Sequence, residues 1–140
     1  MRDAACIVGI GETPYVRKPG SGLGTLALQL RAAVAAIADA GLEPAQIDGI
    51  LPFPNLGHAE SFAANLGCTN LRFQAIVWMG GAAPVASLRV AAAALREGLA
   101  EHVLLVAGWN GYSGARARET VADDVASLPG GTIARDYYLP

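Results

Sequence analysis

Residues 77–84 of this chain of 140 residues read Val77-Trp78-Met79-Gly80-Gly81-Ala82-Ala83-Pro84. A candidate strand ends here and a helix begins within a few residues, with two glycines at the junction. Pro84 fits the first turn of that helix, because an amide hydrogen there would have no helical partner. Such a turn directs backbone N–H groups and the positive helix end toward one point. It is compatible with a tight structural turn, and equally with a site that holds a nucleophile or stabilises an oxyanion.

Apolar runs and helical patterns alternate on both sides of this junction. We expect strands over residues 5–9, 47–51, 71–78 and 103–107, and helices over residues 26–40, 58–66 and 82–97. This alternation predicts an α/β layered fold with a mainly parallel sheet. The third helix carries apolar residues at a spacing of three and four and further alanines on its other faces, which predicts burial on several sides. The spaced apolar positions are Val85, Leu88, Ala92, Leu95 and Leu99.

The composition is unusually apolar for a small domain. Ten Lys and Arg against twelve Asp and Glu give a net charge of −2, which argues against a nucleic-acid binder. Only 16% of the residues are charged, against about 25% in an average globular protein. No apolar run reaches the roughly 18 residues of a membrane span, and the start lacks a signal segment. We therefore expect part of the apolar surface to be buried against another domain or subunit.

The sequence does not predict a metal or nucleotide site. Cys6 and Cys68 are too few for a disulfide scaffold, and we expect both to be reduced thiols of a cytoplasmic protein. Cys68 follows the end of a helix, where the helix dipole raises a thiol pKa, so we interpret it as structural. No Cys/His cluster has metal-ligand spacing. Gly9 and Gly11 resemble the start of a dinucleotide-binding loop, but Pro14 stands where its third glycine belongs, which favours a simple turn.

Four stretches, in this order, resemble the N-terminal half of the thiolase superfamily, and most closely its lipid-transfer-protein-like branch. They are residues 7–14, residues 40–50, residues 71–73 leading into 80–88, and residues 98–108. The resemblance covers nearly the whole chain. It implies a thiolase-like layered fold with a mainly parallel mixed sheet and a buried central helix. Residues 1–140 would form an N-terminal thiolase-like domain, without the second, similar half of the superfamily.

The resemblance also implies a reaction class. Thiolases use a cysteine at the start of the buried helix, and that position is Gly81 here. Glycine has no side chain to acylate, so the thiolase mechanism cannot run from this position. Some lipid-transfer-like relatives lack the cysteine and act as retro-aldolases on CoA thioesters, as in sterol side-chain degradation. The expected activity is cleavage of a carbon–carbon bond in a β-hydroxyacyl-CoA, with a coenzyme A thioester as substrate and no permanently bound cofactor.

The same resemblance suggests where substrate and partners bind. The residues expected to line or border the substrate pocket are Trp78, Met79, Gly80, Gly81, Trp109 and Asn110. Tyr112 is a candidate proton carrier, as are Tyr137 and Tyr138, although a tyrosine with a pKa of about 10 needs assistance. The third strand is expected to pair with its copy in a homodimer, through Arg72, Phe73, Gln74, Ala75, Ile76 and Val77.

Two alternatives remain open on the sequence. The chain could be a non-catalytic acyl-CoA-binding or lipid-binding subunit, or a scaffold that pairs with a small OB-fold acyl-CoA-binding partner. Glycine at position 81 suits this role equally well. A third interpretation is an acyl-CoA acyltransferase, a true thiolase, that uses Cys68.

Overall fold

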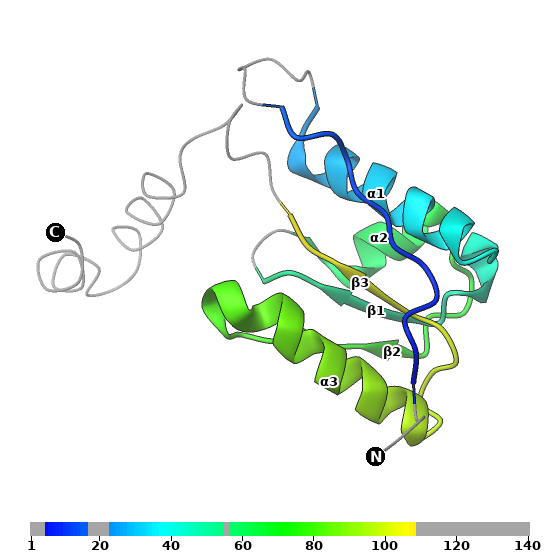
Figure 1. The fold of residues 1–140 in the computed structure, drawn as a ribbon. Coiled ribbons are helices and arrows are strands. Elements are labelled where there is room, and N and C mark those ends of the chain that lie inside the picture. Colours follow the sequence, from blue (N-terminus) through cyan, green and yellow to red (C-terminus); the bar gives the residue numbers. More distant parts are fainter. Residues whose placement is uncertain (1–4, 17–22, 55–56, 109–140) are drawn as a thin grey trace, which may run out of the picture. The chain divides into compact units, whose positions relative to one another are not determined.

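The structure is a computed structural model that describes residues 5–16, 23–54 and 57–108 (Figure 1). The chain divides into two compact units, residues 1–14 with 23–109, and residues 15–22 with 110–140. Of the second unit the structure describes Tyr15 and Val16, which are both exposed. All helices and strands in the described residues belong to the first unit.

Three parallel strands form the sheet of the first unit, in the order β2-β1-β3. They are β1 (Gly49–Pro52), β2 (Phe73–Gln74) and β3 (Val103–Val106). In the central strand, Gly49 lies opposite Phe73 on one side and Val103 on the other. The described sheet is therefore fully parallel, which confirms the predicted α/β fold class.

Helices cover both faces of this sheet (Figure 1). The helices α1 (Thr25–Asp39) and α2 (Ala59–Leu66) pack together on one face, against β3 and β1 respectively. The helix α3 (Ala83–Arg96) packs on the other face, against β3, and short 3₁₀ turns lie at η1 (Pro44–Gln46) and η2 (Gly80–Ala82). The result is a helix–sheet–helix sandwich.

The main core lies between the sheet and the α1–α2 layer. Ile50 of β1 and Phe62 of α2 are completely buried at its centre. Ile37 of α1 and Leu104 and Val106 of β3 pack around them. Every element of this layer thus contributes a large apolar side chain, and burial of these side chains is the main term that stabilises it.

A buried carboxylate joins the amino-terminal ends of the three strands. Asp48 accepts the backbone N–H groups of Glu101 and His102 at 2.9 Å. Arg72 lies 3.4 Å from the same carboxylate and also donates to the carbonyl of Gly98 at 3.0 Å. Arg72, which the sequence assigns to a dimer interface, is therefore engaged within its own chain.

The strand predicted over residues 5–9 is wrong. These residues belong to no strand, and Ile7 and Val8 are largely exposed. The segment lies along α1, where the N–H of Ile10 donates to the carboxylate of Asp39 at 2.9 Å. A Cβ at Gly9 would overlap the carbonyl oxygen of Ala36, so this glycine allows the segment to approach the helix closely. Packing on α1 has replaced strand pairing.

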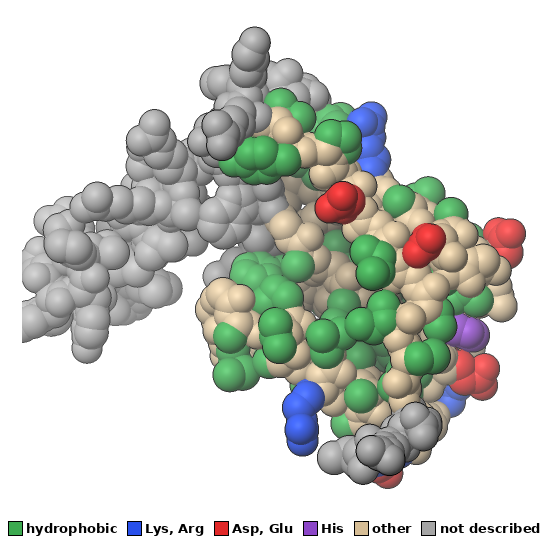
Figure 2. All heavy atoms as spheres, in the orientation of Figure 1, with side chains coloured by type: hydrophobic (Ala, Val, Ile, Leu, Met, Phe, Trp, Pro, Cys, Tyr) green, Lys and Arg blue, Asp and Glu red, His purple; other side chains and the backbone are tan. Residues whose placement is uncertain are grey.

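The helix α3 has two very different faces. Its buried face consists of the small residues Ala83, Ser87, Ala91 and Ala94. The predicted apolar stripe lies off this face, with Val85 71% exposed and Leu88 44% exposed at its start and Ala92 and Leu95 half-buried further on. Hydrophobic side chains accordingly gather on the surface over α3 (Figure 2). The described residues bury α3 along one face only.

Candidate functional site

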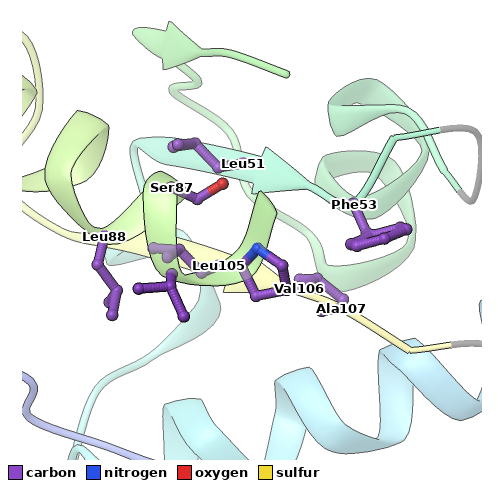
Figure 3. Close-up of a pocket in the computed structure, with 9 residues that line it drawn as sticks. Leu51, Phe53, Ser87, Leu88, Leu105, Val106 and Ala107 are labelled. Atoms are coloured by element: carbon purple, nitrogen blue, oxygen red, sulfur yellow. The ribbon is translucent and has the colours of Figure 1, made fainter. Parts of the chain in front are cut away.

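A cavity of about 280 Å³ lies between the carboxyl ends of β1 and β3 and the first two turns of α3 (Figure 3). In open α/β sheets, ligands bind at the carboxyl ends of parallel strands, so this is the expected position for a site. The walls are apolar except for the hydroxyl group of Ser87. The lining residues are Leu51, Phe53, Pro84, Val85, Ser87, Leu88, Leu105, Val106 and Ala107.

Strand register and helix start together shape this cavity. Leu51 of β1 and Leu105 of β3 are register partners, and both line it. Ser87 is 6% exposed, and its hydroxyl is directed from α3 toward β1, beside Leu51 (Figure 3). Such a surface suits an apolar group with a single polar contact.

The glycine pair lies immediately before α3, in the turn η2. Gly80 has a φ of 52°, a left-handed conformation that glycine adopts without strain. A Cβ at Gly81 would meet nothing within 4 Å. Neither close packing nor a positive φ therefore requires glycine at position 81. The N–H of Ala82 donates to the carbonyl of Met79 at 3.0 Å and closes the turn.

The structure places part of the predicted substrate site at this turn. Trp78 and Met79 are 66% and 58% exposed, and the glycine pair follows them directly. None of these four residues lines the cavity, although Pro84 and Val85, a few residues further on, do. The remaining predicted residues, Trp109, Asn110, Tyr112, Tyr137 and Tyr138, lie outside the described residues.

None of the residues that line the cavity is among the substrate contacts predicted from the sequence. One signal was present, because Ser87 is the single hydroxyl-bearing residue in the alanine-rich segment of α3. The contributions of β1 and β3 depend on the two strands being neighbours across 54 positions of sequence from Leu51 to Leu105. No local pattern carries that information.

The segment proposed to pair across a dimer alternates as an edge strand should. Residues 71, 73, 75 and 77 are half-buried, whereas residues 72, 74, 76 and 78 are exposed. Two of these residues form β2, at the edge of the described sheet. The amide of Gln74 donates to the carboxylate of Glu60 in α2 at 2.9 Å, so this side chain also has a partner in its own chain.

The surroundings of Cys68 favour a structural role. The residue is half-buried and packs against the main core. Burial raises the pKa of the Cys68 thiol, which opposes formation of the nucleophilic thiolate. Over residues 5–16, 23–54 and 57–108, no three His, Cys, Asp or Glu side chains form a group that could hold a metal ion. None of the described helices combines the length and hydropathy needed to cross a membrane.

Comparison with known proteins identifies two curated relatives, while no family model matches the chain. A steroid side-chain-cleaving aldolase of Thermomonospora curvata is 40% identical over 114 residues, which are 81% of this chain and 29% of the relative. A 17-hydroxy-3-oxo-4-pregnene-20-carboxyl-CoA lyase of Mycobacterium tuberculosis is 37% identical over 115 residues, 80% of this chain and 29% of that lyase.

Solved structures agree on the fold. The Ltp2-ChsH2(DUF35) aldolase matches 91% of this chain with a TM-score of 0.73 and 33% identity, over 35% of its own chain. A monomeric SCP2-thiolase-like protein of Mycobacterium smegmatis matches 71% of this chain with a TM-score of 0.58 and 23% identity, over 22% of its own chain, which supports the fold alone. The matched residues of this chain span about 29% of the length of each of the two curated relatives described above.

Proposed function

We propose that this chain, as a member of the thiolase/SCP2-like family, forms part of an acyl-CoA lyase. The proposed reaction is retro-aldol cleavage of a carbon–carbon bond in a β-hydroxyacyl-CoA, in the degradation of a steroid or lipid side chain. The observation that carries this proposal is 40% identity, over 81% of the chain, to an aldolase that cleaves steroid side chains. Glycine at position 81 agrees with it, because a lyase of this kind needs no acylated cysteine.

The reaction requires a base and an oxyanion stabiliser. A base removes the proton of the β-hydroxyl group, the bond between the α- and β-carbons breaks, and a ketone or aldehyde leaves. The electron pair of that bond becomes an enolate on the thioester, which is then protonated at the α-carbon. Hydrogen-bond donors aimed at the thioester oxygen lower the barrier, because they stabilise the charge that develops there.

The turn η2 and the start of α3 are the proposed oxyanion side of the site. The first N–H groups of a helix have no intrahelical acceptor, and the helix dipole is positive there. Without a Cβ at Gly81, a thioester has room to approach this backbone. Exposed Trp78 and Met79 border the same turn and are proposed substrate contacts. Tyr112 remains the proposed proton carrier, with Trp109 and Asn110 as proposed pocket residues.

The cavity beside α3 is proposed to hold an apolar part of the acyl group. Its volume of about 280 Å³ lies just below the roughly 300–1,000 Å³ of sites that enclose a whole small ligand. It therefore suits one portion of a steroid or acyl chain. The coenzyme A portion would lie outside it.

We also propose two protein partners. The solved aldolase joins Ltp2 with ChsH2(DUF35), which supports a second subunit beside this chain, and we propose a small OB-fold protein that binds acyl-CoA. The edge position of β2 supports a homodimer through residues 72–77. Of these residues, Ile76 offers an exposed apolar side chain.

The decisive test is turnover by the complete protein, with and without a co-expressed DUF35-type partner. The substrate is a steroid side-chain β-hydroxyacyl-CoA, and mass spectrometry measures release of a ketone and a shortened acyl-CoA. Substrate-dependent formation of both products supports the lyase. Tight binding of the thioester without cleavage would instead favour the non-catalytic binding subunit, and neither binding nor cleavage would refute both.

A further inference from the structure

Gln29 is a buried amide on an otherwise apolar face of α1. The buried residues of this helix are Gln29, Ala33 and Ile37, which recur every four positions and therefore share one face. Gln29 is only 3% exposed. Burial of an amide is costly unless its hydrogen bonds are replaced, so an apolar residue would be the simpler choice here.

The amide nitrogen of Gln29 holds the chain where it leaves β3. It donates to the carbonyl oxygen of Gly108 at 2.7 Å. This orientation of the amide is the only one that forms the bond, because a carbonyl oxygen needs a donor. Gly108 has a φ of 125°, a backbone conformation that favours glycine. The contact thus holds Gly108, two residues beyond the end of β3, in a backbone conformation that other residues rarely adopt.

The amide oxygen of Gln29 is buried and has no hydrogen-bond partner in the described part of the chain. It lies 3.6 Å from the place that a Cβ at Gly57 would occupy, in the loop that follows β1. Gln29 therefore sits beside the two segments that leave neighbouring strands. The same two segments carry Phe53 and Ala107, which line the cavity.

We propose that Gln29 is a positioning residue for the lyase site. Through the carbonyl of Gly108 it sets the path of the segment after β3, which forms one wall of the cavity at Ala107. The unsatisfied oxygen shows that the residue does not optimise stability, and departures of this kind are expected at functional positions. This inference rests on the proposed lyase activity. It assigns a role in that activity to a residue that lies away from the glycine turn.

The test replaces Gln29 by methionine in the complete protein. Gln29→Met keeps the length of the side chain and removes both polar atoms, so the melting temperature should change little. Loss of the Gly108 contact should shift the cavity wall, and a displacement of about 1 Å can lower the rate roughly 10²-fold. We expect kcat to fall by this order while KM changes less. Hydrogen exchange should accelerate at Phe53, whose N–H donates to the carbonyl of Val106 at 2.8 Å and thus reports on the start of this segment.

The matched control is Ile37→Val, a change on the same buried face of α1 that leaves the amide intact. It should lower thermal stability without changing kcat or hydrogen exchange at Phe53. Unchanged kcat in Gln29→Met, or an equal loss in Ile37→Val, would overturn the inference. If the wild-type protein shows no lyase activity, the proposed function fails, and hydrogen exchange then decides the positioning role by itself.

Discussion

Gly81 is the residue on which the proposed chemistry depends most directly. A Cβ there would meet nothing within 4 Å, so Gly81→Ala should leave the unfolding free energy within about 1 kcal/mol of the wild type. The added methyl group would stand where the thioester is proposed to approach the backbone. We therefore expect kcat/KM of the complete enzyme to fall by roughly 10²-fold. Steady-state kinetics and denaturant unfolding measure the two effects.

Gly24 offers a matched control for that change. It too has no atom within 4 Å of a Cβ, its φ is −73°, and it lies at the start of α1. Gly24→Ala should leave kcat/KM unchanged. A Gly81→Ala enzyme with wild-type kinetics would show that the substrate does not approach this turn.

Asp48 is the side chain whose loss should most weaken the sheet. Both carboxylate oxygens accept backbone N–H groups in the turn before β3. Asp48→Asn leaves one acceptor oxygen and turns an N–H₂ group toward those donors. Because it leaves buried polar groups unsatisfied, we expect a loss of about 1–3 kcal/mol in unfolding free energy, measured by urea denaturation. Glu101→Gln, which keeps the same backbone donor, should change stability little.

A pH-dependent contact joins α2 to β2. The backbone N–H at the helix start, followed by the hydrogen bond from Gln74, holds the pKa of Glu60 below its ordinary value of 4.5. A lowered pKa in the folded state means that the ionised form stabilises the fold. This contribution is complete above pH 4.5 and is lost as the pH falls through the lower folded-state pKa.

The variant Glu60→Gln isolates that contribution. The melting temperature of the wild type should fall more steeply than that of the variant as the pH drops below the ordinary carboxyl range. Above that range both proteins should show the same pH dependence. Parallel curves throughout the acid range would rule out a role for Glu60 in acid stability.

The helices were predictable from the sequence because the signals that end them, such as a glycine with a positive φ, are local in the sequence. Gly41, Gly67 and Gly98 all have positive φ values, and each observed helix ends within two residues of the prediction. A strand, by contrast, needs a partner. Residues 5–9 have the composition of a buried strand, yet they lie on α1 because Gly9 and Gly11 let the backbone approach it.

The periodicity of the sequence could not predict which face of α3 packs on the sheet. The spacing of Val85 and Leu88 predicts an apolar stripe, but it does not say which face packs on the sheet. The sheet accepts the small face, with Ser87 and Ala91, and this choice creates the cavity. The glycine turn could be proposed as a site from the sequence alone. The walls of the cavity could not, because they form only where β1 and β3 become neighbours in the tertiary structure.

The exposed face of α3 bears on how the first unit fits into a larger assembly. Val85 is 71% exposed and Leu88 44% exposed, away from the buried face of the helix. The chain spans about 29% of the length of its curated relatives, and those relatives contain further polypeptide that this chain does not match. The low charged fraction of 16% led to the expectation that part of the apolar surface is buried against another domain or subunit.

Chemical labelling tests whether this face is covered in the complete protein. In a Cys6→Ser background, the thiol introduced by Val85→Cys should react rapidly with a maleimide in the chain of residues 1–140, because position 85 is exposed there. If other polypeptide packs on α3, the same thiol should react far more slowly in the complete protein. Ala93→Cys, at an exposed position of the same helix to one side of Val85, controls for the general mobility of α3. Equal rates at position 85 in both proteins would mean that the face stays open to solvent, and the cavity beneath it would then be complete without a covering layer.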